Sequence, residues 1–167
     1  MAFDRLADVQ ANLTTLYKQL AGEERAFLLA EEAEKVRIQQ KIDLTWQRIR
    51  EFEREYAITL SQQIKRHELP EPVAETVTAE LVDELEILTP LQRQDDIKAL
   101  LQQILEELQK PDTPASAKLK VAIPLIPNVV SYELEGDTES VVRRLFPTFV
   151  KAYEGLRSLA SPEEQKK

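Results

Sequence analysis

The chain has 167 residues and a net charge of −8, and 31% of its residues are charged while only 6% are aromatic. The length suits one domain, or one core with an extended element. Three glycines and no cysteine argue against phosphate-binding loops, thiolate metal sites and a cysteine nucleophile. The composition therefore favours long exposed helices over a loop-built active site.

Residues 1–66 predict a coiled-coil-like helical hairpin. Leucine and valine recur at three- and four-residue spacing from Leu6 to Leu20, which predicts a short amphipathic helix, and Gly22 is the expected turn. Residues 23–66 contain neither glycine nor proline, so one helix of about 65 Å is expected there. Its apolar stripe comprises Ile38, Ile42, Trp46, Ile49, Phe52, Tyr56 and Leu60.

That stripe is longer than a helix over residues 3–20 can cover. Part of the stripe must therefore pair with another helix or with a second copy of the chain, and the sequence favours the second copy, which makes the protein a homo-oligomer. Trp46, Ile49 and Phe52 are candidate interaction residues on the stripe, with ordinary helix packing as the simpler explanation.

Residues 67–114 predict an acidic helix pair with proline-rich boundaries. Pro70 and Pro72 end the long helix, and Thr89 and Pro90 are expected to begin the second helix of the pair as its N-cap and first residue. Residues 67–117 carry 12 acidic and 3 basic residues. This charge disfavours nucleic acid as a partner and would suit a basic protein, but a solvated acidic face is the favoured explanation.

Residues 115–158 predict a β-hairpin followed by a helix, which makes the fold class mainly α with an α+β element. Leu119, Val121, Ile123 and Leu125 alternate with other residues as in a strand, Pro127-Asn128 is the expected turn, and Val130, Tyr132 and Leu134 alternate again. A C-terminal amphipathic helix, capped by Asp137 and either kinked or split in two at Pro147, is expected next. Residues 159–167 are expected to be disordered.

Candidate chemistry is sparse. His67 is the only histidine, and the adjacent carboxylate pairs, such as Glu31 and Glu32, point in different directions on a helix. We expect no catalytic residues, no metal site and no cofactor. A basic cluster around Arg143 and Arg144 is expected to balance the acidic segment within the molecule.

The segment PASAKLKVAIPLIPNVVSYELEGDTES resembles a short module in bacterial multidomain proteins that carry NACHT-type NTPases, TIR or caspase-like effectors, or repeat arrays. The charged hairpin of residues 1–66 is similar in style to the leaders of those proteins. The resemblance covers about 30 residues and implies an adaptor or effector-coupling role, with no catalytic residues to carry over. The chain ends soon after this segment, which predicts a free-standing adaptor or a fragment of a longer protein.

The sequence thus predicts a non-enzymatic protein–protein interaction module. The start of the chain lacks the apolar region of a signal peptide, and the apolar run over 121–130 is too short to span a membrane, so we expect a cytoplasmic protein. The alternative is a membrane-targeting element that acts through residues 121–130 and 141–153. The candidate interaction residues of the apolar segment are Ile123, Pro124, Leu125, Pro127, Val130 and Tyr132.

Overall fold

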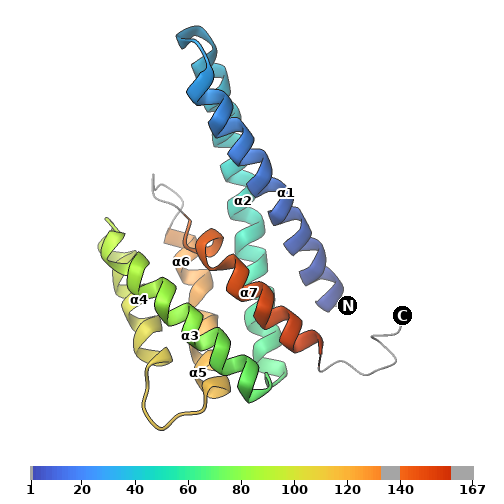
Figure 1. Ribbon diagram of the computed structural model, residues 1–167, viewed down its shortest axis with the longest axis vertical. Coiled ribbons are helices and arrows are strands. Elements are labelled where there is room, and N and C mark those ends of the chain that lie inside the picture. Colours follow the sequence, from blue (N-terminus) through green and yellow to red (C-terminus); the bar gives the residue numbers. More distant parts are fainter. Residues whose placement is uncertain (1, 133–139, 159–167) are drawn as a thin grey trace.

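The protein is described by a computed structural model over residues 2–132 and 140–158, and throughout these residues it forms helices and connecting turns without a β-strand. A long hairpin of two helices projects from a body of shorter helices (Figure 1). The elements are α1 (Ala2–Leu29), α2 (Glu32–Arg66), α3 (Glu71–Leu88), the 3-10 helix η1 (Thr89–Leu91), α4 (Asp95–Leu108), α5 (Ala115–Ala122), the 3-10 helix η2 (Ile123–Leu125), α6 (Ile126–Tyr132) and α7 (Val141–Arg157).

The predicted β-hairpin is wrong. Its first strand and turn fold as α5, η2 and α6, and the end of its second strand, around Leu134, lies outside the described residues. Pro124 stands in the first turn of η2 and Pro127 is the second residue of α6. A proline is tolerated in the first turn of a helix, because the N–H that it lacks would have no partner there. The two prolines therefore divide a helical segment and do not mark a strand.

The hairpin turn also lies elsewhere than expected. Gly22 is inside α1, and the chain reverses at Ala30 and Glu31, so the two helices are closer in length than residues 1–22 and 23–66 would be. Glu31 is in an extended conformation, and Glu32 and Glu34 occupy the first turn of α2. Acidic residues there interact favourably with the positive end of the helix dipole.

The helix after Thr89 begins later than predicted. Thr89 closes α3, where its hydroxyl donates to the carbonyl oxygen of Leu85 at 2.6 Å, and Pro90 belongs to η1. The helix α4 begins only at Asp95, with Asp95 and Asp96 in its first turn. The threonine and proline thus form a connecting turn.

The body is built around the C-terminal half of α2. This half packs against η2, α6 and α7, while α3 packs on α5 and α7, and α4 packs on α5 and α6. Each helix contributes one apolar face: α1 buries Leu6, Val9, Leu13, Leu16 and Leu20, and α2 buries Ile42, Ile49, Tyr56, Leu60 and Ile64. The result is one continuous core that includes the base of the hairpin.

The last helix, α7, begins at a side-chain cap. The Ser140 hydroxyl accepts a hydrogen bond from the backbone N–H of Arg143 at 3.2 Å, and α7 continues through Pro147 as one helix. The cap predicted from sequence, Asp137, lies outside the described residues. Ser140 therefore fixes the position at which α7 meets the hairpin.

Candidate functional site

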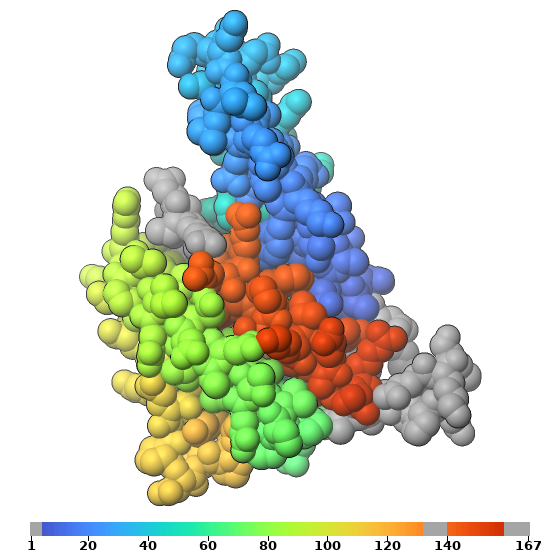
Figure 2. All heavy atoms as spheres, viewed as in Figure 1, coloured from blue at the N-terminus to red at the C-terminus, as the bar shows by residue number. Residues whose placement is uncertain are grey.

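The end of the hairpin, which we call the tip, comprises residues 21–41. No side chain in this range, all of which the structure describes, is buried. Figure 2 shows the tip standing clear of the body as a narrow projection. Leu28, Leu29 and Val36 are 79%, 82% and 66% exposed. Three such large, exposed apolar side chains on one short projection make the tip a candidate interaction surface.

The tip is internally ordered by short-range contacts. Glu34 accepts from Arg37 at 2.6 Å and Glu32 pairs with Lys35 at 3.4 Å, both one helical turn apart along α2. The ammonium group of Lys35 also lies 5.5 Å from the ring centroid of Phe27, which joins α2 to α1. Exposed pairs of this kind each contribute only a few tenths of a kcal/mol. The exposed leucines thus extend from a tip whose own stabilising contacts are weak.

A buried polar cluster lies at the base of the hairpin, where α1, α2 and α7 meet. Its centre is Glu53 of α2, which is fully buried. The Tyr17 hydroxyl donates to its Oε2 at 2.6 Å, and the Ser140 hydroxyl lies 2.8 and 2.7 Å from its two oxygens. One carboxyl group thereby connects three helices that are far apart in the sequence.

The electrostatic environment of Glu53 favours the protonated acid. Burial raises its pKa to about 7, although the hydrogen bonds from Tyr17 and Ser140 and the nearby charges of Arg50 and Arg143 lower it. Removing a charged group from water is costly unless the protein compensates for it, and here the compensation is partial. The Glu53 carboxyl therefore changes charge near neutral pH.

Aromatic side chains pack against one another beside Glu53, and two of them carry hydroxyl groups. Phe146 lies 5.5 Å, centroid to centroid, from both Tyr17 and Tyr56. The Tyr56 hydroxyl donates to Gln10 at 3.0 Å, and burial raises the pKa of Tyr56 well above its usual range. Tyr56 stays a neutral hydrogen-bond donor and is no candidate for a catalytic base.

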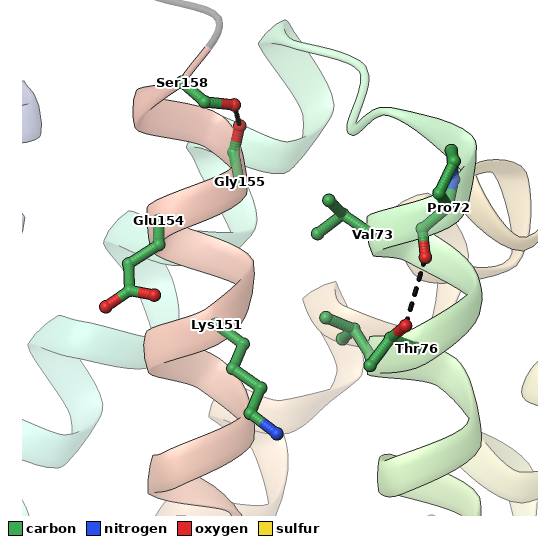
Figure 3. A pocket seen from close by; sticks show the side chains of 8 residues that line it. Pro72, Val73, Thr76, Lys151, Glu154, Gly155 and Ser158 are labelled. Atoms are coloured by element: carbon green, nitrogen blue, oxygen red, sulfur yellow. Dashed lines mark hydrogen bonds between the residues drawn. The ribbon is translucent and has the colours of Figure 1, made fainter.

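An open groove with a volume of about 450 Å³ lies between α3 and α7. Figure 3 shows Val73 and Thr76 on one wall and Lys151 and Gly155 on the other. Thr76 donates to the backbone of its own helix at 3.2 Å, and Lys151 pairs with Glu80 of α3. Both of these polar groups are therefore engaged within the protein.

The candidate interaction residues predicted from sequence are scattered over the structure. Ile49, Ile123 and Val130 are buried, Trp46, Phe52, Pro124, Leu125 and Pro127 are partly buried, and the side chain of Tyr132 lies outside the described residues. Most apolar side chains on which the membrane alternative depends, including Ile126, Val129 and Phe149, also face the core. Within the described residues no helix is long and apolar enough to cross a membrane.

Two members of the basic cluster in the last segment, Arg144 and Lys120, pair with the acidic segment, as predicted for the cluster. Arg144 pairs with Glu84 at 2.5 Å, and Lys120 pairs with Glu68 at 3.0 Å. In the described part of the chain no three acidic or histidine side chains are grouped so that they could hold a metal ion.

Sequence reasoning missed both features on which the arguments below rest. Leu28 and Leu29 were hidden inside a helix assumed to continue through Ala30. Glu53 lies four residues after Ile49 and three before Tyr56, which is the spacing of the buried face. A carboxylate at such a position was the available signal. Comparison with protein-family models, curated proteins and solved structures finds no match to this chain.

Proposed function

We propose that this chain is a protein–protein interaction module that self-associates through the tip of its hairpin. The observation that carries the proposal is the exposure of Leu28, Leu29 and Val36 on a projection that the other described residues leave uncovered. The body holds the base of this projection rigidly, because five apolar residues of α1, from Leu6 to Leu20, are buried there. The projection can then present its end to a partner at little entropic cost.

A second copy of the chain is the partner that the charge pattern of the tip favours. Residues 21–34 carry five acidic residues and one basic residue, whereas residues 35–41 carry three basic residues and none that is acidic. Each tip thus carries both signs of charge, and within one tip Lys35 and Arg37 pair with Glu32 and Glu34. A surface that carries both signs can pair with a second copy of itself, as a twofold interface requires.

The wider role we propose is that of a cytoplasmic adaptor in a bacterial signalling or defence system. It rests on the resemblance of residues 114–140 to modules in NACHT-type NTPase and TIR or caspase-like proteins, and on the interaction surface at the tip. In this role, association of the tips would bring together whatever the bodies bind.

Light scattering across a concentration series tests self-association. We expect the wild type to shift from monomer to dimer or larger with rising concentration, and a Leu28→Gln, Leu29→Gln double variant to remain monomeric. The matched control is Ile87→Gln with Leu91→Gln, because these side chains are also exposed, at 52% and 65%, but lie on the body. A monomer at every concentration, or a tip variant that associates like the wild type, would contradict the proposal.

A further inference from the structure

The start of α7 is held on the hairpin by Glu53. Ser140, which is 4% exposed, is the N-cap of α7 and accepts from the Arg143 N–H, while its hydroxyl contacts both carboxyl oxygens of Glu53. The same carboxyl accepts from Tyr17 of α1. A single side chain of α2 therefore joins the cap of α7 to α1.

The ring of Tyr17 extends this junction. It packs edge-on against Phe146 of α7, and the guanidinium of Arg143 lies 5.5 Å from its centroid. The titratable and charged groups that face Glu53 are thus Tyr17 from α1, Arg50 from its own helix and Arg143 from α7. We call Glu53, Tyr17 and Ser140 the latch.

The hydrogen bonds of the latch can be satisfied in both charge states of Glu53. In the ionised state, the Tyr17 and Ser140 hydroxyls both donate to the carboxylate. In the neutral state, the carboxylic O–H can donate to the Ser140 oxygen while Tyr17 donates to the other carboxyl oxygen. What separates the two states is therefore the cost of holding a negative charge in a buried site.

We propose that the latch is a proton-operated contact that holds the start of α7 on the hairpin when Glu53 is neutral and loosens when Glu53 is ionised. Burial places the transition near pH 7, since it raises the pKa of Glu53 to about that value from 4.5. Opening the latch returns the carboxyl to water, where it ionises freely. The open state therefore gains population as the pH rises.

Hydrogen–deuterium exchange of the full chain tests the latch. The readout is the exchange of residues 141–150, corrected for the intrinsic pH dependence of amide exchange, with α4 as the internal reference. Linkage predicts that the opening equilibrium of residues 141–150 rises roughly 30-fold between pH 5.5 and pH 8.5. Equal corrected exchange at the two pH values would overturn the proposal.

Variants assign the effect to Glu53. Glu53→Gln should abolish the pH dependence, and Glu51→Gln, an exposed neighbour on the same helix, should retain it. Tyr17→Phe keeps the ring against Phe146 but removes a donor that favours the charged form, so the transition should move to higher pH. If Tyr17→Phe increased the exchange of residues 141–150 by the same factor at every pH, the contact would be purely structural and the proposal would be overturned. This outcome can be read whether or not Glu53→Gln folds.

Discussion

The two halves of the hairpin have the same helical geometry but are stabilised differently. The base, where Leu6–Leu20 face Ile42–Ile64, is buried under α6 and α7 and belongs to the common core. The tip, residues 21–41, has no buried side chain among its residues, all of which the structure describes. Helices of this length are marginal without tertiary packing. The base is therefore built for stability, and the tip is available for binding.

The largest effect should come from a charge placed in the body. Ile123 in η2 is 1% exposed and lies where this short helix packs on α2. An unpaired aspartate there costs an amount comparable with the whole stability of a domain, about 5–15 kcal/mol, so Ile123→Asp should unfold the body. Val121→Asp is the matched control, because Val121 is 50% exposed and two residues away. Circular dichroism distinguishes them; a folded Ile123→Asp protein would contradict the core described above.

The segment around Ile123 illustrates what the sequence could and could not predict. Its buried residues are Leu119, Ala122, Ile123, Ile126, Val129 and Val130. Their spacing of three, one, three, three and one is that of a helix face, so the correct signal was present. The two prolines favour a strand and a turn in the sequence, because proline interrupts a helix interior. Each proline is tolerated because it lies in the first turn of a new helix. Periodicity alone does not show where one helix ends and the next begins.

The hairpin was predicted correctly in kind but not in its turn. The face of α1 from Leu6 to Leu20 is buried as the spacing indicated. The turn was predicted at Gly22 because glycine favours turns, whereas the chain turns at Ala30 and Glu31 without glycine or proline. The acidic residues Glu32 and Glu34 were the remaining indication of a helix start. The tip could not be found from sequence, because exposure depends on where the body ends.

The next effect concerns the one fully buried carboxyl of the described core, Glu53. Its pKa is raised from 4.5 to about 7 in the folded state, so the folded protein binds the proton more tightly than the unfolded chain. The stabilisation from this proton is complete below pH 4.5 and is lost as the pH rises through 7, a total of about 3 kcal/mol. Urea unfolding at pH 5 and pH 8 measures the loss.

A substitution separates this contribution from the other titrating groups. Glu53→Gln should exceed the wild type in stability at pH 8, by an amount that disappears toward acidic pH. Glu24→Gln, which removes an exposed carboxylate of the tip, should follow the wild type at both pH values. If Glu53→Gln were less stable than the wild type at pH 8, the stabilisation from the hydrogen bonds to the carboxylate would exceed the cost of burying its charge.

A smaller effect is expected where Gly155 of α7 faces Val73 of α3. A Cβ added at Gly155 would lie 2.7 Å from Cγ1 of Val73 and 2.9 Å from Cδ2 of Leu69. Gly155→Ala should therefore destabilise the body by about 1–3 kcal/mol through overpacking. Adding Val73→Ala to Gly155→Ala removes the closest contact and should recover part of this loss, which a double-mutant cycle in urea would detect as coupling. Additive losses would place the strain elsewhere.

The smallest effect tests the independence of the tip. Gly22 lies inside α1 with no atom within 4 Å of an added Cβ, in contrast to Gly155. Gly22→Ala should stabilise the helix by up to about 1 kcal/mol, because alanine restricts the unfolded chain and meets no obstacle. If the tip opens separately from the body, amide exchange of residues 23–29 should slow by about fivefold while the midpoint of global unfolding in urea stays nearly constant. An equal gain in both measurements would mean that tip and base unfold as one unit, and the distinction between a stable base and a separately opening tip would fail.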